Sequence, residues 1–598
     1  MEVRLARTAG FCMGVRLAME KVVALAKSSR EPLYTCGPLI HNTQALEMLE
    51  ALGVRNLEDC PEATAGTVVI RAHGVRKEER AALAARGFRL ADATCPNVLA
   101  SQRKCQEFAE RGYAVIIAGD KDHAEVAGLK SYAGERAVVV STPEEASRLA
   151  VSGPACLIAQ TTFNEQTYRE IADTLRARVG DLEVVESICR ATHERQEEAR
   201  RLAAEVEAMV VVGGRHSANT RRLAEIARAS GKPTFHVETP DELDREALAR
   251  FKVVGLTAGA STPNWLTRAV LQALEEIEPP TTPLRSTARR LLDFLVRSNL
   301  YSAAAAAAAT GGTCALAGGC EAPKWLFPLA AFAFILTATT VNRLAPGEAA
   351  PRCMPPRLAF YRRHQGKLLL ASGAATLAAF AALAAYGNYW SLSLLAVAYA
   401  FGLAYSLPVI PGPLSQRLGG ARLKDLPASK DILIALGWAT VCVFVPLVSG
   451  YEGRWWVAAQ VAWLVFALAF ARAVAMDLRD MQDDYLQGRE TLPILIGPRR
   501  ARWLMAAVLL SAVATQGWPL ARVTWELLRG EISLALNQLI GPFYLPRPWL
   551  LSGLPPPAIG LVLAVQEKCL DTETRCVLAW DGLLLLFGAV AFLVAPFR

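Results

Sequence analysis

The chain has 598 residues, more than one ordinary domain needs, and its hydrophobic fraction of 53% is high for a soluble protein. Its net charge of +8 comes without a basic stripe carrying aromatic side chains, which argues against nucleic-acid binding. The 13 cysteines are an odd number at irregular spacing, which argues against a disulfide framework and favours free thiols in a reducing compartment.

The first half, up to about residue 280, alternates short β-branched runs with amphipathic helical stretches such as 76–87. This alternation predicts an α/β fold with parallel sheets, in which ligands bind beyond the carboxyl ends of the strands. No apolar signal core follows Met1, so we expect this half not to be exported. The predicted strands end in glycine, histidine, serine or threonine and lie at 67–75, 113–120, 155–162, 207–217 and 252–261.

Three cysteines, Cys12, Cys95 and Cys189, lie near predicted strand ends or turns, 83 and 94 residues apart. Spacing alone favours three ordinary buried cysteines, since no short Cys-x-x-Cys pair occurs. The other interpretation is that three α/β units each give one thiolate to a common centre. Soft thiolates select iron–sulfur clusters, zinc or copper(I), and three ligands would leave one coordination position open for a substrate.

Polar side chains that follow the apolar runs predict a pocket for a phosphorylated ligand. Each histidine alone is more typical of a surface or capping position, and Glu125 would serve as a proton source only if its pKa is tuned. Nearby glycines strengthen the prediction, because glycine lets backbone amides approach a phosphate. The candidate residues are His41, His73, His123, Glu125, Ser217, Asn219 and Ser261.

A segment rich in proline and threonine and then basic marks the end of the first half. We expect a linker at 281–298 between a domain at 1–280 and a domain at 299–598. Beyond the linker, nine apolar runs have the length of membrane-spanning helices. The loops after the second, fourth and sixth runs carry most of the basic residues, so the positive-inside rule puts them, and the first half, in the cytoplasm. The runs lie near 300–318, 325–342, 368–386, 391–410, 432–449, 455–475, 503–518, 548–566 and 577–596.

The best motif of the second half is MDLRDMQDDYLQGRETLPILIG at 476–497. Its Asp477, Asp480 and Asp484 fall on one helical face, at positions i, i+3 and i+7. Acidic residues at a membrane interface are costly without a role, and clustered carboxylates there would hold Mg²⁺ and, through it, a diphosphate. The spacing supports equally well the alternative of a solvated face at the end of an amphipathic helix.

Nine motifs of the first half resemble, in order, those of the LytB/IspH family, the 4-hydroxy-3-methylbut-2-enyl diphosphate reductases of the methylerythritol phosphate pathway to isoprenoids. They cover nearly all of residues 1–275 and read GFCMGVRLAMEKV, PLIHN, RAHGV, DATCP, HAEVAG, QTT, SICRAT, SANTRRL and GLTAGASTPNWL. The resemblance implies three pseudo-equivalent α/β units around a [4Fe–4S] cluster held by Cys12, Cys95 and Cys189, with the fourth iron open to the substrate's hydroxyl. Two electrons and protons would then remove this hydroxyl as water, giving isopentenyl and dimethylallyl diphosphate.

The resemblance also implies a role for each pocket residue. The three histidines match diphosphate-binding histidines, and the serine and asparagine residues complete the anion site. Glu125 matches the proton donor, and Thr161 the hydroxyl that orients it and the substrate. Ala218 stands where the family often has a second serine, and its backbone amide would still donate. An electron donor such as a ferredoxin or flavodoxin is implied as well.

The second half resembles the UbiA-type membrane prenyltransferases. The 476–497 motif matches the family's second aspartate motif, and AYSLP at 404–408 followed by Lys424 resembles its middle loop. In the first motif, Asn-x-x-x-Asp-x-x-x-Asp, the chain keeps Asn342 but has Pro346 and Ala350 at the aspartate positions, with Glu348 the only acid nearby. We therefore expect either an altered Mg²⁺–diphosphate site, made by Asn342 and the three aspartates, or a degenerate domain that serves as an anchor.

The combined prediction is a multi-pass protein of the cell inner membrane. A three-unit α/β reductase domain in the cytoplasm precedes an all-α polytopic domain of about nine helices. Its expected partners are a prenyl diphosphate, the electron donor and membrane lipid. The alternative from another class is a zinc or redox-sensing thiolate module on a membrane anchor. A transporter is disfavoured, because the second half lacks paired hydrophobic repeats with charges at mid-membrane.

Overall fold

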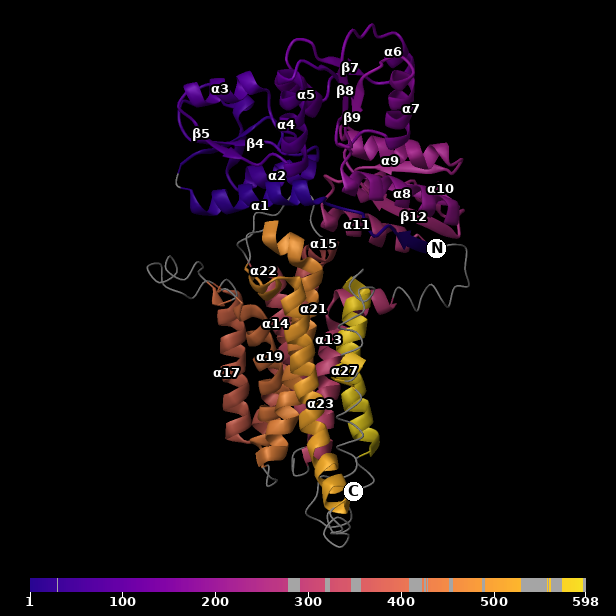
Figure 1. The fold of residues 1–598 in the computed structure, drawn as a ribbon. Coiled ribbons are helices and arrows are strands. Elements are labelled where there is room, and N and C mark those ends of the chain that lie inside the picture. The colour runs from indigo at the N-terminus through magenta and orange to yellow at the C-terminus, as the bar shows by residue number, and fades with distance from the viewer. Residues whose placement is uncertain are drawn as a thin grey trace. The chain divides into compact units, whose positions relative to one another are not determined.

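The computed structural model describes residues 1–29, 31–277, 291–317, 323–345, 356–407, 428–450, 455–486, 490–528 and 573–594, with a few single positions between 422 and 560. The chain divides into two compact units, of which the first contains Met1–Thr281 and the second contains the long apolar helices (Figure 1). Each unit is described by itself.

The first unit contains three four-stranded sheets, and all of their strands run parallel. The central strands are buried on both faces, which explains their unbroken apolar composition. In spatial order the sheets are β1 (Glu2–Leu5), β12 (Val253–Ala258), β10 (Ala208–Val212) and β11 (Thr234–Val237); β3 (Val54–Asn56), β2 (Leu33–Cys36), β4 (Thr67–Ile70) and β5 (Arg89–Asp92); and β7 (Val138–Val140), β6 (Ala114–Ala118), β8 (Ala155–Ala159) and β9 (Leu182–Val184).

Helices connect these strands, as parallel strands require. They pack their apolar faces against the sheets, where most of the buried side chains lie. The helices are α1 (Met13–Ser28), α2 (Thr43–Ala51), α3 (Lys77–Ala85), α4 (Pro96–Glu110), α5 (Ala124–Ala133), α6 (Pro143–Ser147), α7 (Glu165–Arg176), α8 (Arg190–Glu205), α9 (Ala218–Ala229), α10 (Arg245–Leu248) and α11 (Asn264–Glu275).

The three sheets share one topology. The second sheet has the order β3-β2-β4-β5 and the third has the order β7-β6-β8-β9, so in each the second strand lies at one edge and the fourth at the other. The first sheet repeats this order as β11-β10-β12-β1, with the amino-terminal strand of the chain as its fourth strand. The prediction of an α/β domain with three equivalent units is therefore confirmed.

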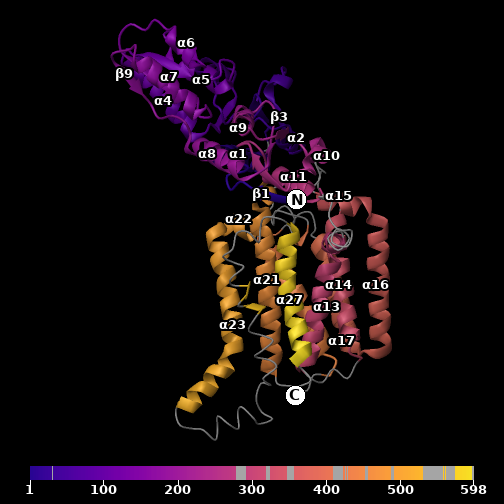
Figure 2. The ribbon, with the colours of Figure 1, turned by 90° about the vertical axis from the view of Figure 1, so that its right-hand side faces the viewer.

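The second unit is all helical. Figures 1 and 2 both show α13, α14, α21 and α27 running alongside one another. A π-helical turn at Thr440–Phe444 joins α19 to α20. The described helices are α13 (Leu300–Ala317), α14 (Leu326–Leu344), α15 (Pro356–Arg363), α16 (Gln365–Tyr386), α17 (Tyr389–Ser406), α19 (Ser429–Ala439), α20 (Val445–Leu447), α21 (Trp455–Leu486), α22 (Leu492–Ile496), α23 (Pro498–Leu528) and α27 (Glu573–Val594).

The alanine-rich sequence of α13 has a packing explanation. A Cβ atom placed on Gly588 of α27 would lie 2.1 Å from the carbonyl oxygen of Ala308 on α13. On the other side, a Cβ on Gly312 would lie 3.0 Å from the Cα of Gly588. Small residues let two helix backbones approach this closely, which is a common means of association between membrane helices.

Five of the described helical segments are long and apolar enough to cross a membrane, which makes the chain a multi-pass membrane protein. Among the described residues, α13 and α23 do not meet that standard, and the apolar part of α27 is shorter. Eight of the nine predicted runs coincide with a helix or a helical pair, and the run at 548–566 lies largely outside the described residues. The five segments are Leu326–Leu344, Gln365–Tyr386, Tyr389–Ser406, Ser429–Leu447 and Trp455–Met481.

Candidate functional site

Equivalent loops of the three units carry the residues that the sequence singled out. The loop after the first strand of each unit carries His41 (after β2), His123 (after β6) and Ser217 (after β10). The loop after the third strand carries His73 (after β4), Thr161 (after β8) and Ser261 (after β12). All six therefore follow the carboxyl ends of inner strands, where ligands bind in parallel sheets.

The three cysteines occupy a third equivalent position. Each follows the fourth strand of its unit and is the N-cap residue of the next helix: Cys12 for α1, Cys95 for α4 and Cys189 for α8. Helix N-termini stabilise thiolates, because their free backbone N–H groups and the helix dipole favour negative charge. The same fourth-strand loop of each unit thus offers one thiol.

Contacts between the cysteine loops bring the thiols into one region. A Cβ atom on Gly14, two residues after Cys12, would lie 2.5 Å from the sulfur of Cys95. Asn97, two residues after Cys95, donates its side-chain N–H to the sulfur of Cys189 at 3.0 Å. Among the described residues, the three histidines lie close enough together to share a single ion. The three thiols do not.

Hydrogen-bond donors and one buried positive charge lie beside the thiols. The sulfur of Cys12 accepts the backbone N–H of Val15 at 3.4 Å. Burial raises the pKa of the Cys95 thiol, and the backbone N–H groups of Asn97 and Val98 act in the opposite direction. The guanidinium of Arg195 is buried and donates to the carbonyl of Gly10 at 2.8 Å, and thiolates at positions 12 and 189 would interact favourably with its charge.

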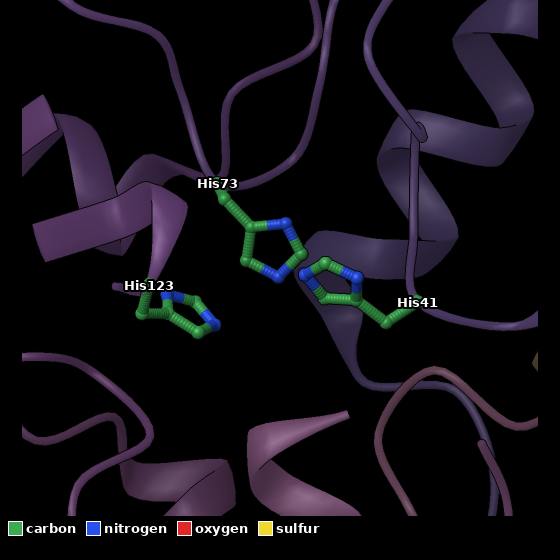
Figure 3. A group of neighbouring side chains, drawn as sticks. All are labelled: His41, His73 and His123. Atoms are coloured by element: carbon green, nitrogen blue, oxygen red, sulfur yellow. The ribbon is translucent and has the colours of Figure 1, made fainter. Parts of the chain in front are cut away.

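The three histidines point toward one another (Figure 3). Their ring centroids lie 4.7 Å apart for His41 and His73, 5.8 Å for His41 and His123, and 5.3 Å for His73 and His123. One ring nitrogen of each lies within 4.8 Å of those of the other two. The nitrogen Nδ1 of His123 accepts the backbone N–H of Glu125 at 3.1 Å, which leaves its Nε2 as the donor on the opposite side of the ring.

The surroundings of the trio suit an anion better than a metal ion. Burial lowers the pKa of His41, lowers that of His73 well below its usual value and lowers that of His123 to about 4. The positive charge of Arg71 also lowers the pKa of all three imidazoles, and that of Arg221 lowers two of them. A cation bound among the rings would meet the same repulsion, whereas a diphosphate would relieve it.

Buried polar groups lie around the start of α9, close to His41. The hydroxyl of Ser261 donates to the carbonyl of His41 at 3.1 Å and lies 3.4 Å from the hydroxyl of Ser217. Ser217 is the N-cap of α9, so the backbone N–H groups of Ala218 and Asn219 open that helix. Both polar atoms of the Asn219 side chain are buried and lack a hydrogen-bond partner among the described residues. An unpartnered buried amide at the start of a helix suits the binding of an anion.

Glu125 is fully buried beside the trio, in the first turn of α5. Its carboxylate accepts the backbone N–H of Thr161 at 2.7 Å and the hydroxyl of Thr161 at 3.0 Å. Burial raises the pKa of Glu125 to about 7, although both hydrogen bonds oppose that rise. A carboxyl group with this pKa can hold or release a proton near neutral pH, as a general acid must.

The acids of the second half lie on α21 and are engaged by basic side chains. Lys430 on α19 forms an ion pair with Asp477, and its Nζ lies 3.8 Å from Oδ2 of Asp484. Arg479 donates to Asp480 at 2.7 and 2.5 Å. Asn342 lies half-buried in the last turn of α14. The predicted positions 346, 348, 350, 424, 488 and 489 lie outside the described residues.

Residues 3–275 match the model of the LytB protein family. The 4-hydroxy-3-methylbut-2-enyl diphosphate reductase of Oleidesulfovibrio alaskensis is 46% identical over 285 residues, which are 46% of this chain and 100% of that protein. The chain belongs to the LytB family. The protein of the same name from Geobacter sulfurreducens is 41% identical over 278 residues, or 46% of this chain and 98% of its own length. The prediction of a LytB-family iron–sulfur enzyme is therefore confirmed.

The second half of this LytB-family chain has relatives of its own. Residues 308–551 match the model of the UbiA prenyltransferase family. A solved UbiA homologue from Archaeoglobus fulgidus, bound to GPP and Mg²⁺, is 19% identical, with a TM-score of 0.29, over 50% of this chain and 98% of that one. The chain is thus a LytB-family domain fused to a UbiA-family membrane domain, as predicted.

Sequence reasoning missed several polar residues of the LytB-family site and of the membrane half. Arg71 and Asn97 lie two residues from His73 and Cys95. Polar residues are common on the surfaces of loops and helices, so neither was singled out from the sequence. Arg195 and Lys430 had no signal, because a basic residue on an amphipathic helix is normally solvated. Asp431 likewise gave none, although it is completely buried.

Proposed function

We propose that residues 1–280 reduce 4-hydroxy-3-methylbut-2-enyl diphosphate to isopentenyl and dimethylallyl diphosphate. The observation that carries this proposal is the threefold repetition of the site. Each unit offers one N-cap thiol after its fourth strand and polar side chains after its first and third strands. The same repeated unit thus supplies thiols for a redox cofactor and hydrogen-bond donors for a diphosphate. The relatives described above are named as reductases of this substrate.

The cysteine site fits an iron–sulfur cluster of the [4Fe–4S] type. Cys12, Cys95 and Cys189 would hold it, with N–H donors to two of the sulfurs and the buried cation of Arg195 nearby. A single zinc ion would need its thiolates about 3.8 Å apart, given zinc–sulfur bonds of about 2.3 Å in a tetrahedral site. Among the described residues, the thiols of Cys12, Cys95 and Cys189 do not form such a close group. When bound, the cluster would supply the two electrons and an open iron position.

The anion pocket would bind and orient the substrate. The diphosphate would accept hydrogen bonds from the three histidines, Ser217, Asn219, Ser261 and the backbone N–H groups that begin α9 at Ala218. Its negative charge would offset the repulsion between the trio and Arg71. Holding the diphosphate fixes where the far end of a five-carbon substrate lies, which is the orientation that chemistry at its hydroxyl requires.

Proton delivery falls to Glu125. The hydroxyl of Thr161 fixes one carboxylate oxygen and the backbone N–H of the same residue fixes the other. Burial keeps the carboxyl group protonated up to about neutral pH. Overall, two electrons and two protons convert the allylic alcohol into an alkene and water, and Glu125 would give one of these protons. The electron donor would be a small redox protein such as a ferredoxin or flavodoxin.

The second domain, beginning after a linker at 281–298, would be a membrane prenyltransferase that uses short prenyl diphosphates. Its support is the acidic stretch of α21, which ends an apolar helix long enough to span a membrane. The basic loops around this stretch would lie on the cytoplasmic side of the cell inner membrane, together with the reductase domain. A Mg²⁺ ion held by these acids would bind the diphosphate leaving group.

The decisive experiment uses the full chain, purified in detergent without oxygen. We expect a brown protein that contains iron and sulfide and that, with a chemically reduced electron donor, forms isopentenyl and dimethylallyl diphosphate. Cys95→Ser should lose colour and activity together. Cys36→Ser is the matched control, because the Cys36 thiol is buried in the same domain and bonds Glu79 at 2.9 Å, which a serine hydroxyl can also do.

Two results would contradict the proposal. A colourless protein that contains zinc would support a zinc or redox-sensing thiolate module instead. A Cys95→Ser protein that keeps its cluster and its activity would remove this cysteine from the site.

A further inference from the structure

Arg222 joins the helix that begins the anion site to two loops of another sheet. It lies on α9, three residues after Asn219. Its Nη2 lies 3.4 Å from Oδ1 of Asp120 in the loop after β6, and its guanidinium carbon lies 5.2 Å from the ring centre of Phe163 in the loop after β8. The helix α9 follows β10, which belongs to a different sheet from β6 and β8. One side chain thus connects two of the three α/β units at the site.

The two loops that Arg222 contacts are fastened to each other. The side-chain oxygen of Gln160 accepts the backbone N–H of Asp120 at 2.9 Å, and Gln160 is completely buried. The strands β6 and β8, which lead into these loops, are hydrogen-bonded neighbours. The loops therefore form one rigid piece, which carries Glu125 on one side and Thr161 on the other.

The surroundings of Arg222 differ from those of a solvated surface arginine. Its side chain is 19% exposed, and its Nε is buried without a hydrogen-bond partner among the described residues. Its other carboxylate neighbour, Glu225, is on the same helix and 57% exposed, so that pair is screened by water and joins no units. A guanidinium is planar and can pair with a carboxylate while it stacks on an aromatic ring, as this one does between Asp120 and Phe163.

We propose that Arg222 is a positioning residue that sets the place of the anion-binding start of α9 relative to Glu125. The predicted diphosphate donors Ser217 and Asn219 belong to α9, whereas Glu125 belongs to α5. The substrate is then held by one unit and protonated by another, so the rate depends on how these two units are fixed to each other. A misplacement of about 1 Å can cost about 10²-fold in rate. The inference rests on the proposed function for its reaction.

The first test measures steady-state reduction of the hydroxy-diphosphate by the full chain, in detergent and without oxygen. Arg222→Met keeps an unbranched stem over Phe163 but removes the charge that meets Asp120. We expect kcat to fall at least about tenfold, while KM and iron content stay nearly the same, because Arg222 supplies no donor to the anion. Arg222→Lys should recover part of the loss. Arg228→Met is the matched control, because this exposed arginine lies on the same helix.

The partner of Arg222 gives a second, independent comparison. Asp120→Asn should lower kcat about as much as Arg222→Met, and the double variant should be no slower than either single variant, because all three remove the same contact. Losses that multiply in the double variant would mean that the two side chains act separately, which contradicts the inference.

A further measurement needs no reductase activity. Hydrogen exchange of the full chain, with and without inorganic pyrophosphate, shows whether an anion bound at α9 protects residues 160–166, a segment without a predicted anion donor. We expect this protection in wild type and in Arg222→Lys, and its loss in Arg222→Met. Wild-type chain without the protection, or Arg222→Met chain with unchanged kcat, overturns the inference. Protection that depends on Arg222 in a chain that reduces no hydroxy-diphosphate would refute the proposed function alone.

Discussion

Glu125 and Thr161 are hydrogen-bonded to each other within the third unit of the reductase domain. Thr161 donates hydrogen bonds to both carboxylate oxygens of Glu125. Its backbone N–H lies 2.7 Å from one oxygen, and its hydroxyl lies 3.0 Å from the other. The two side chains come from the first-strand and third-strand loops of the same sheet, after β6 and β8, which are hydrogen-bonded neighbours. Their relative position is therefore set by the pairing of these strands, and the acid is held before any substrate arrives.

The pH dependence of turnover should report the protonation of Glu125. Burial raises the pKa of Glu125 to about 7. The protonated form, which donates the proton, is therefore fully populated well below pH 7 and is lost as the pH rises above that value. Turnover should be constant at low pH and fall about tenfold by one unit above the pKa. Glu125→Gln should retain the cluster and lose turnover by about 10²–10⁴-fold. Unchanged turnover in this variant would exclude Glu125 as the acid.

Thr161→Val should move the alkaline limb of the same profile to higher pH. The hydroxyl of Thr161 stabilises the charged carboxylate of Glu125. Without this hydroxyl the pKa of Glu125 rises, so its protonated form persists to higher pH. The measurement is a full pH profile of the steady-state rate for wild type and variant. Thr162→Val is the control, because its hydroxyl accepts from the side chain of Gln160 instead. An identical limb in Thr161→Val would show that the hydroxyl does not act on the acid.

Gly14→Ala should cost the protein its cluster. The added methyl group would lie 2.5 Å from the sulfur and 2.9 Å from the Cβ of Cys95, so that thiol must move away from the other two. Iron and sulfide content per chain measures the effect. Gly180→Ala is the control, because no atom lies within 4 Å of its added Cβ. A Gly14→Ala chain with full iron content would mean that Cys95 is not held at this place in the functional protein.

The sequence predicted the inner strands of the reductase domain better than the outer ones. The five predicted strands coincide with β4, β6, β8, β10 and β12, whose residues are apolar and β-branched because helices or neighbouring strands cover both faces. Edge strands such as β5 and β9 are half-exposed and three or four residues long, so they carry no comparable pattern. The cysteines follow these edge strands, which explains why spacing alone could not distinguish them from ordinary buried cysteines.

The membrane half was predictable in outline and not in its polar interior. Apolar runs revealed the helices, since the length needed to cross a bilayer is fixed. Nothing in a linear pattern shows which helix faces another, so the burial of Asp431 against α21 could not be read from the sequence. The same holds for Arg195, whose buried position depends on how α8 packs beside Gly10.

Asn97 should tune the redox potential of the cluster. Its side-chain N–H donates to the sulfur of Cys189 at 3.0 Å, and such bonds stabilise the more negative, reduced state. Asn97→Leu should therefore make the midpoint potential more negative while iron content stays the same. A redox titration followed by electron paramagnetic resonance measures it. Gln106→Leu on the same helix is the control, because that amide bonds Glu110. An unchanged potential would mean that the bond is absent from the loaded protein.

A buried ion pair should control the stability of the membrane domain. Arg472 of α21 pairs with Asp581 of α27, and its Nη2 lies 3.3 Å from the hydroxyl of Ser302 on α13. Asp581 is completely buried, and the guanidinium lies 5.7 Å from the ring centre of Trp438. The pair therefore joins three helices that are far apart in the sequence.

Removing one partner of this pair should cost far more than removing both. Asp581→Asn leaves a buried guanidinium without its counter-charge, and we expect a loss of about 3–5 kcal/mol in the free energy of unfolding. The double variant Arg472→Met with Asp581→Leu keeps apolar volume and leaves no charge, so it should lie close to wild type. Unfolding in detergent, followed by circular dichroism of the helices, gives both values. Equal losses in the single and double variants would show that the two side chains do not stabilise each other.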